Sequence, residues 1–445
     1  MNKITLSFFG LGYVGLVYAA VFAHKNIPVI GFDIDTEKLN LLKSGKSPIF
    51  EPGLDELIKT DIEKGLLTVT DDPIKAVHNS NVTFITVGTP SNEDGSIDLK
   101  YVIEASKMIG EALKNKDEWH LVVMKSTVTP GTTNEIVKTT IEKTSNKKAY
   151  KDFGIAVNPE FLKEGNAIED CMNPDRIVIG ANDEKSAKIL EEIYQDFKSP
   201  KIITSLENAE LIKYANNAFL AMKVSFINMI ANLCQKIPGT DVETVAKAIG
   251  LDKRIGPHFL KAGAGWGGSC WPKDLKALIK FGEKMNIKLP LVNATLEINN
   301  EQPYKIIELA EELIGELKNK KIAILGLSFK PNTDDIRDAV SIKIIKTLLN
   351  KGAHITAYDP AAMKNFKKLF NNITYANTPL DCIKDADCAL IITEWDEFKK
   401  LKPEDFTKLM KNPAIVDGRR IYNPHEYIKH TKFKAIGLGP QQTTQ

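Results

Sequence analysis

The stretch ITLSFFGLGYVG, residues 4–15, decides the fold of the first half of the chain. Its apolar run predicts a buried strand, and LVYAAVFAH at 16–24 continues it as an apolar helix. Gly10, Gly12 and Gly15 match the pattern G-x-G-x-x-G. In this pattern the first glycine permits a tight turn, the second lets the backbone approach a pyrophosphate, and the third lets the helix pack on the strand. The stretch therefore predicts the opening unit of a dinucleotide-binding fold.

The next strand, IPVIGFD at 27–33, ends in Asp33, at the distance where an acidic residue reaches the adenosine ribose. A carboxylate accepts hydrogen bonds from ribose hydroxyls and repels the extra phosphate of NADP. The neighbouring DIDTE adds negative charge and no arginine, so NAD is the predicted cofactor. Lys38 has two interpretations, a contact on the adenosine side or a solvated helix lysine.

Composition narrows the class of protein. The 445 residues predict two or three domains. The net charge of +2, from 59 basic and 57 acidic residues, argues against binding to nucleic acid or membranes through bulk charge. Five cysteines without a CxxC pair predict reduced thiols rather than disulfides or a metal site.

The start of the chain has a second interpretation. Lys3 and the apolar run after it resemble a signal peptide. The glycine pattern and the strand that follows favour a folded unit instead. We expect no segment long enough to span a bilayer, and therefore a cytoplasmic protein.

Further strands alternate with helices, as an α/β sheet requires. Strands within 82–90 and 121–132 end in small and hydroxyl residues, among them Thr89, Ser126 and Thr127. Such strand ends form the ligand crevice of a doubly wound sheet, although turn capping is the alternative role for these hydroxyls.

A second βα pattern begins near residue 321. KIAILGLSFK, HITAYDP, CALIITEW and AIVDGRR repeat the strand pattern without the full glycine triplet, so we expect a ligand other than a complete dinucleotide. Lys330, Arg337 and Arg420 follow strand ends, where they can meet phosphates. The polar tail at 437–445 is expected to be disordered.

The middle of the chain predicts a long helix over 207–236 that is apolar on nearly every face after Leu211. Lys213 inside it is either a functional cation or a lysine that reaches the surface near the helix start. The surplus apolar surface predicts a homodimer or a higher oligomer. Glu160 and Glu164 share one face only if their segment is helical.

Cys270 leaves the glycine-rich stretch GAGWGGSCWPKD, residues 263–274. It is either a buried apolar thiol or a nucleophile beside a substrate that the glycines admit.

Together these motifs resemble those of the UDP-glucose 6-dehydrogenase family of nucleotide-sugar dehydrogenases. The resemblance covers nearly the whole chain, in the order GLGYVG (10–15), FEPGL (50–54), GTP (88–90), KST (125–127), NPEFLKEG (158–165), AELIKYANNAF (209–219), GAGWGGSCWPKD (263–274) and GLSFKPNTDDIRDA (326–339). It implies an α/β protein with a Rossmann-type NAD domain (1–200), a central helical dimerisation region (201–300) and a Rossmann-like UDP-binding domain (301–436).

The resemblance also implies roles for individual residues. The implied nucleophile is Cys270, and the other implied catalytic residues are Lys213, Asn217, Asp274, Glu160, Glu164 and Thr127. The implied NAD contacts are Gly10, Gly12, Tyr13, Val14, Gly15, Asp33, Lys38, Thr89, Pro90, Ser126, Thr127, Glu164, Lys273 and Arg337. The implied substrate contacts are Glu160, Phe161, Leu162, Lys213, Asn217, Phe259, Lys261, Gly263, Gly267, Lys330 and Arg420, with Arg254 reaching the substrate from a partner subunit.

The implied reaction oxidises UDP-glucose to UDP-glucuronate, a precursor for polysaccharides, through a thiohemiacetal and a thioester on Cys270, without a metal. Trp266 and Trp271 replace residues that are more usual in the family and leave sugar selectivity open, with another UDP-sugar such as a UDP-N-acetylhexosamine as the alternative. Ser269 before Cys270 favours the glucose type. A two-electron hydroxyacid dehydrogenase and an inactive NAD-binding sensor are the rival hypotheses.

Overall fold

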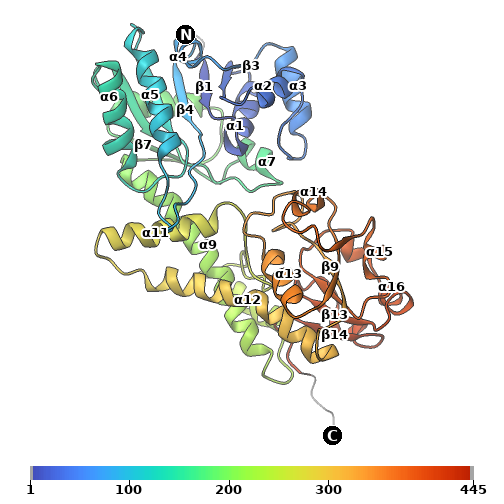
Figure 1. Cartoon of the computed structure of the whole chain (residues 1–445). Coiled ribbons are helices and arrows are strands. Elements are labelled where there is room, and N and C mark those ends of the chain that lie inside the picture. The colour runs from blue at the N-terminus through green and yellow to red at the C-terminus, as the bar shows by residue number, and fades with distance from the viewer. Residues whose placement is uncertain (1–3, 441–445) are drawn as a thin grey trace. The chain divides into compact units, whose positions relative to one another are not determined.

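The computed structural model describes residues 4–440 of the chain (Figure 1). The chain divides into two compact units. Unit 1 comprises Met1–Asn216 with Lys276–Asn286, and unit 2 comprises Asn217–Leu275 with Ile287–Gln445.

Unit 1 is built on an eight-stranded sheet in the order β3-β2-β1-β4-β5-β6-β7-β8. Neighbouring strands are parallel except for the antiparallel pair β6 and β7. The strands are β1 (Leu6–Phe9), β2 (Val29–Phe32), β3 (Leu67–Thr70), β4 (Val82–Ile85), β5 (His120–Met124), β6 (Phe153–Val157), β7 (Ile177–Ala181) and β8 (Lys201–Thr204). The strand order reverses between β1 and β4, and such a switch point is where open α/β sheets bind ligands.

The predicted first unit is confirmed, since β1 is fully buried and α1 (Tyr13–His24) begins directly after the glycine turn. A Cβ on Gly15 would lie 2.0 Å from the Gly10 carbonyl oxygen, so only glycine permits this packing. The other helices of unit 1 are α2 (Thr36–Lys43), α3 (Leu54–Glu63), α4 (Pro73–His78), α5 (Lys100–Lys114), the π-helix η1 (Thr133–Val137), α6 (Lys138–Ser145), α7 (Ala167–Met172) and α8 (Glu184–Ile193).

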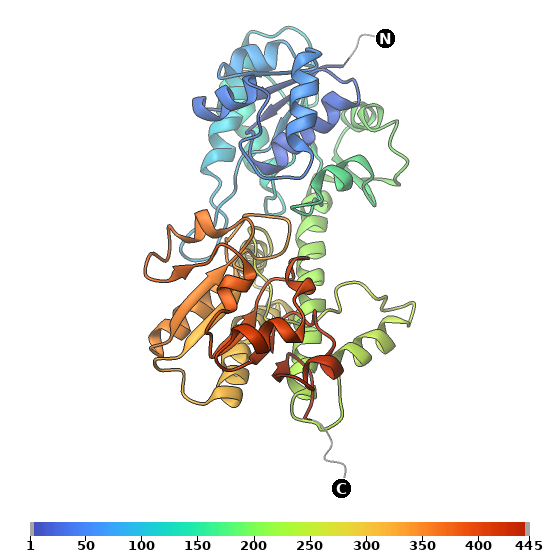
Figure 2. The ribbon, with the colours of Figure 1, turned by 90° about the vertical axis from the view of Figure 1, so that its right-hand side faces the viewer.

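The predicted central helix is α9 (Leu206–Cys234), which runs unbroken through the boundary at residue 216 (Figure 2). It is less buried than its composition predicts, because Phe219, Phe226 and Leu233 are all exposed. By length and composition α9 is also the one helix within residues 4–440 that could cross a bilayer, which corrects our expectation. Core helices of other proteins pass the same test.

Unit 2 contains a six-stranded parallel sheet in the order β11-β10-β9-β12-β13-β14, the order of the first six strands of unit 1. Its strands are β9 (Lys321–Leu325), β10 (His354–Tyr358), β11 (Thr374–Tyr375), β12 (Cys388–Ile391), β13 (Ala414–Asp417) and β14 (Lys432–Ala435). The repeated pattern in the sequence therefore corresponds to a second doubly wound sheet.

The remaining helices lie between α9 and β9 or between the later strands of the chain. They are α10 (Val242–Gly250), α11 (Trp271–Lys284, which crosses into unit 1 at residue 276), α12 (Pro290–Ile314), α13 (Val340–Asn350), α14 (Met363–Phe366), α15 (Pro379–Ile383), the 3-10 helix η2 (Phe398–Lys400), α16 (Pro403–Leu409) and α17 (Pro424–Tyr427).

The first residues of the expected disordered tail are held in place, because the Gly439 N–H donates to the Thr240 carbonyl and the Gly239 N–H donates to the Pro440 carbonyl. The rest of that tail, 441–445, lies outside the described residues.

Candidate functional site

The glycine turn of unit 1 leaves the start of α1 open. The helix begins after Gly12, and no side chain within residues 4–440 caps it. A Cβ on Gly12 would meet no atom within 4 Å. An uncapped helix N-terminus with an open backbone face suits a pyrophosphate, so this turn fits the dinucleotide that the sequence predicts.

Asp33 lies at the end of β2, and its carboxylate accepts three hydrogen bonds, one of them at Oδ1 from the Asp35 N–H at 3.0 Å. Its Oδ2 accepts from the Leu11 N–H at 2.8 Å and from Lys38 Nζ at 2.7 Å. Lys38 is therefore not a solvated helix lysine, because it forms an ion pair with Asp33. A contact with the adenosine side remains a prediction. The Asp35 side chain caps α2 and accepts from the Lys38 N–H.

The hydroxyl residues predicted at strand ends follow the neighbouring strands β4 and β5. The Ser126 hydroxyl donates to the Val87 carbonyl at 2.7 Å and so joins the two strand ends. Thr89 is buried and Thr127 is partly buried. Ser126 therefore serves as the turn cap that we held as the alternative, and it lies at the predicted ligand edge of the sheet.

Lys213 of α9 forms a buried ion pair with Glu160, with 2.8 Å between Nζ and Oε1. Burial opposes ionisation of Glu160, but Lys213 and the Leu162 N–H stabilise the carboxylate, and the net result is a lowered pKa. The pair therefore holds a carboxylate and a cation in one apolar setting. This arrangement suits proton transfer and stabilisation of an oxyanion.

The segment that carries Glu160 and Glu164 is not helical. Residues 158–166 form an irregular loop between β6 and α7, so the two carboxylates share no helix face. In this loop the Phe161 ring lies 3.8 Å from the Arg176 guanidinium.

Glu51, in the quoted motif FEPGL, has a structural role that our sequence analysis missed. Its carboxylate accepts from the Tyr13 hydroxyl and, at 2.7 Å each, from the N–H groups of Gly165 and Ala167. Glu51 thereby joins the glycine turn to the loop of Glu164 and to the start of α7. The only sequence signal was an acidic residue just before a Pro-Gly turn.

In unit 2, Cys270 is exposed and lies directly before α11, while the other four cysteines are buried. The buried Asp274 in the first turn of this helix accepts from Asn217 Nδ2 at 2.7 Å and from Lys273 Nζ at 2.6 Å. Asn217, Lys273 and Asp274 thus form one hydrogen-bonded group. Asp274 follows Cys270 by four positions in the sequence.

The glycines before Cys270 permit close packing within unit 2. A Cβ on Gly267 would lie 2.2 Å from the Asp338 carbonyl oxygen, and the Gly268 N–H donates to the Arg337 carbonyl at 2.9 Å. The loop therefore lies against the segment GLSFKPNTDDIRDA. We expected these glycines to make room for a substrate, and the structure gives them this packing role as well.

Four of the predicted cations of unit 2 are paired with acids or rings of the same chain. Ion pairs join Arg254 to Asp252 at 2.7 Å, Arg337 to Asp335 at 2.6 Å and Arg420 to Asp241 at 2.8 Å, and Lys330 Nζ lies 5.6 Å from the Phe329 ring centroid. Lys261 is exposed, Phe259 has a φ of 63°, and the Gly263 N–H donates to Asn228.

Arg420 turns into the fold with a φ of 53°, and its side chain is only 3% exposed. Its neighbour Arg419, which the sequence analysis passed over, instead donates to the Gly265 carbonyl in the loop before Cys270. Asp359 ends β10 as Asp33 ends β2, but it is fully buried and accepts from the Leu327 and Ser328 N–H groups. A ribose contact like that predicted for Asp33 is therefore closed to Asp359, which agrees with a different ligand for this sheet.

The first sheet, the open glycine turn and the acid after β2 define a dinucleotide-binding α/β protein. Three family models then match in order: the NAD binding domain of the UDP-glucose/GDP-mannose dehydrogenase family at 4–198, its central domain at 207–301 and its UDP binding domain at 323–424. The chain belongs to the UDP-glucose/GDP-mannose dehydrogenase family and is an NAD-dependent oxidoreductase.

Similar proteins match over nearly the whole chain. A UDP-glucose 6-dehydrogenase of Bacillus subtilis is 43% identical, covering 97% of this chain and 93% of its own, and one of Rhizobium meliloti is 44% identical, covering 98% and 99%. A solved UDP-glucose dehydrogenase of Pyrobaculum islandicum has a TM-score of 0.92 at 38% identity, with 98% of both chains covered. A UDP-D-ManNAc dehydrogenase of Pyrococcus horikoshii has a TM-score of 0.86 at 28% identity, with 98% and 99% covered.

Proposed function

We propose that this protein oxidises the primary alcohol of UDP-glucose to the carboxylate of UDP-glucuronate, with NAD as the electron acceptor. The observation that carries the proposal is the exposed Cys270 at the start of α11, next to the buried group formed by Asn217, Lys273 and Asp274. Two relatives named UDP-glucose 6-dehydrogenase, 43% and 44% identical to this chain, support glucose as the sugar of the substrate.

The chemistry explains why a cysteine is needed. Oxidation of an alcohol to an acid removes four electrons, and NAD accepts two at a time as hydride. Cys270 adds to the aldehyde formed in the first oxidation and gives a thiohemiacetal. The second oxidation converts this adduct to a thioester, and water hydrolyses it to the carboxylate and the restored thiol. Two equivalents of NADH form for each sugar.

The proposed roles come from the family resemblance and from the chemistry of each side chain. A position at the start of α11 favours the thiolate of Cys270, because helix N-termini stabilise negative charge. Lys213 stabilises an oxyanion, and Asn217 with Asp274 orients the reacting groups. Glu160 acts as general base on the hydrolytic water, and Thr127 and Glu164 place that water.

The sheet of unit 2 is the proposed site for the UDP part of the substrate. Lys261, Lys330 and Arg420 are the proposed phosphate and sugar contacts, and Arg254 is proposed to serve a partner subunit. Arg420 must leave Asp241 or act through it, because its guanidinium is already hydrogen-bonded within the fold.

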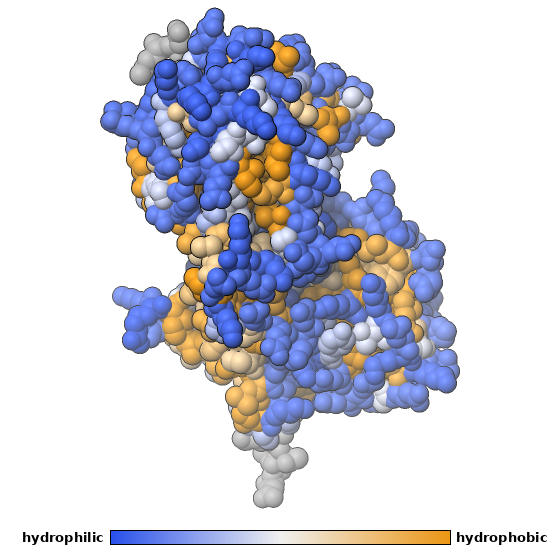
Figure 3. Space-filling view, turned by 60° about the vertical axis from the view of Figure 1, so that its left-hand side comes forward, coloured by the Kyte–Doolittle hydropathy of each residue, from blue (hydrophilic) through white to orange (hydrophobic). Residues whose placement is uncertain are grey.

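We also propose a homodimer formed through the exposed face of α9. The three exposed residues Phe219, Phe226 and Leu233 recur every seven residues, and Figure 3 shows apolar side chains gathered on the lower left of the face it draws. A regular apolar stripe on one helix is the pattern that pairs helices. A cytoplasmic location follows from the need to keep Cys270 reduced.

The test is the amount of NADH formed per mole of limiting UDP-glucose, for the wild type and for Cys270→Ser. We expect two equivalents from the wild type and no hydrolysed product from the variant. One equivalent of NADH in both the wild type and the variant would show that Cys270 takes no part in the reaction.

The same assay with UDP-N-acetylmannosamine tests the alternative sugar. Turnover with this sugar but not with UDP-glucose would keep the mechanism and change the substrate. No NADH from either sugar would contradict the proposal.

A further inference from the structure

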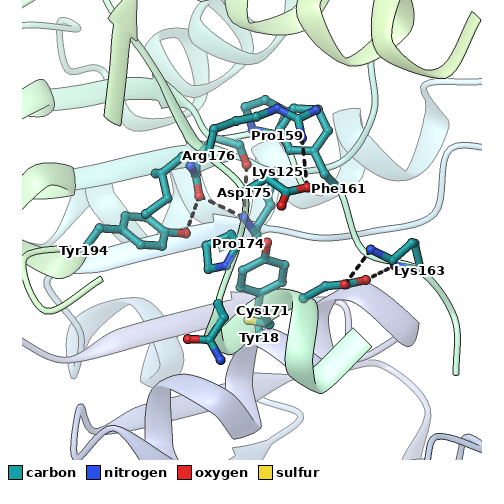
Figure 4. Close-up of a pocket in the computed structure, with 14 residues that line it drawn as sticks. Tyr18, Lys125, Pro159, Phe161, Lys163, Cys171, Pro174, Asp175, Arg176 and Tyr194 are labelled. Carbon is teal, nitrogen blue, oxygen red and sulfur yellow. Dashed lines mark hydrogen bonds and ion pairs between the residues drawn. The ribbon is translucent and has the colours of Figure 1, made fainter. Parts of the chain in front are cut away.

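The end of β6 in unit 1 is held by a buried cluster around Asn158. Lys125 Nζ donates to Asn158 Oδ1 at 2.8 Å and to its carbonyl at 3.2 Å. The Tyr194 hydroxyl donates to the same Oδ1 at 2.6 Å, and Asn158 Nδ2 donates to the Val178 carbonyl at 2.8 Å. Figure 4 shows Lys125 and Tyr194 converging on this point. The cluster thus links Lys125, directly after β5, and Val178, near the start of β7, to Asn158, where the Glu160 loop begins.

Lys125 is 1% exposed and forms no ion pair among the described residues. Its ammonium lies 3.6 Å from the centroid of the Tyr18 ring. Burial lowers the pKa of Lys125 to about 7, partly offset by Cys171 and Glu160, while Lys213 adds to the lowering. Burial of a lysine is unfavourable, and a methionine would fill the same space without that penalty. A buried lysine at this place therefore calls for a function.

A small cavity lies against the cluster and is lined by both loop and cluster residues, including Lys125, Asn158, Pro159, Phe161, Cys171 and Arg176 (Figure 4). The cavity has a volume of about 40 Å³ and can admit water. The loop after Asn158 therefore has open space on one side. The anchor at Asn158 fixes the start of this loop, and Lys213 and Glu51 hold its later residues.

We propose that Lys125 is a positioning residue whose ammonium group holds Asn158 and, through it, the loop that carries Glu160. When protonated, Lys125 also favours the ionised form of Glu160 and lowers the pKa of that carboxyl. The proposal rests on the proposed role of Glu160 as general base. It accounts for a buried cation that the fold alone does not require.

The experiment compares Lys125→Met with the wild type in the full-length protein. We expect kcat for UDP-glucose oxidation to fall by at least about tenfold, which corresponds to the loss of one charge-assisted hydrogen bond. NAD affinity should stay within about threefold, because the glycine turn is untouched. The midpoint of thermal unfolding should equal or exceed that of the wild type, and the amides of residues 160–167 should exchange faster.

Lys116→Met is the matched control. Lys116 is also buried, and its Nζ donates to the carbonyls of Val77, His78 and Ser80 at the end of α4. Lys116 is a structural lysine, so we expect its loss to lower the unfolding midpoint and to leave kcat unchanged.

Two results would overturn the proposal. One is an unchanged kcat in Lys125→Met. The other is a fall in kcat together with a lowered unfolding midpoint and unchanged exchange in the loop, as for a lysine that only stabilises the fold. Glu160→Gln separates this inference from the proposed function. If that variant turns over normally, the role of Glu160 fails, while amide exchange in Lys125→Met still decides whether Lys125 anchors the loop.

Discussion

The carboxylate of Asp33, at the end of β2, accepts hydrogen bonds from the Leu11 N–H in the glycine turn and from Lys38 Nζ. We expect Asp33→Ser to weaken NAD binding by about tenfold, because a hydrogen bond to a charged group contributes about 1.5–3 kcal/mol. The preference for NAD over NADP should fall as well, since the repelling charge is gone. Titration with both cofactors measures the two effects.

The control for this change is Asp35→Asn, which keeps the cap on α2 and should leave NAD affinity unchanged. An Asp33→Ser variant that still rejects NADP would show that another group selects the cofactor.

Lys125 gives the free energy of unfolding a pH dependence. Its folded pKa of about 7 is below the ordinary value of about 10.4. Between these values the unfolded chain binds more protons, so stability rises with pH through this window, by up to about 1.4 kcal/mol per unit. Urea unfolding from pH 7 to 9 should show this slope in the wild type relative to Lys125→Met. Parallel curves would mean that Lys125 does not titrate there.

Single residues show where sequence reasoning stops. The position of Asp33 after a strand could be predicted from the sequence, whereas the role expected of Cys270 came from the family resemblance. The pairing of Lys38 with Asp33 and the inward turn of Arg420 could not be predicted, because rotamers and a φ of 53° decide them. The burial of Lys125, in KST after β5, could not be predicted either, since nothing in a strand-end lysine signals burial.

Among the elements, η1 depends on a carboxylate from another helix. Glu210 of α9 accepts from the Gly131 N–H at 2.6 Å and from the Thr133 N–H at 2.8 Å. We expect Glu210→Ala to reduce the free energy of unfolding by about 1–3 kcal/mol, because both N–H groups lose their acceptor. Urea unfolding measures the loss, and amide exchange in Thr133–Val137 should accelerate.

Glu207→Ala is the control on the same helix, because Glu207 accepts one side-chain hydrogen bond, at 3.2 Å from Asn134. Its effect should stay within about 0.5 kcal/mol. Equal losses in the two variants would mean that the bonds to the backbone of η1 add nothing.

Elements with long apolar runs were predictable from the sequence, and irregular segments were not. β1, α1 and α9 follow from their apolar patterns. The Glu160 loop does not, because its shape depends on Asn158, Lys125 and Glu51, which come from three separate parts of the chain. Long-range hydrogen bonds of this kind leave no periodic trace.

At the scale of the whole molecule, the two sheets share one strand order but belong to domains for different ligands. The first sheet lies in the NAD binding domain and the second in the UDP binding domain. The sequence predicted the repeat from its strand pattern, and the missing glycine triplet predicted a different ligand for the second sheet. The buried Asp359 gives the physical reason, since its carboxylate is occupied by the backbone N–H groups of Leu327 and Ser328 in the turn after β9. The exposed stripe on α9 is the feature that the single chain leaves unexplained.

The proposed dimer predicts the effect of a charge on that stripe. Phe226 is 44% exposed between Phe219 at 58% and Leu233 at 57%. We expect Phe226→Glu to convert a dimer to a monomer in sedimentation experiments, because burial of an unpaired carboxylate costs several kcal/mol. Leu369→Glu, at a residue 56% exposed near α14, is the control and should sediment as the wild type does. A Phe226→Glu protein that remains dimeric would place the subunit contact on another face. If the monomer also loses turnover while it still binds NAD, the missing contribution comes from the partner subunit, as proposed for Arg254.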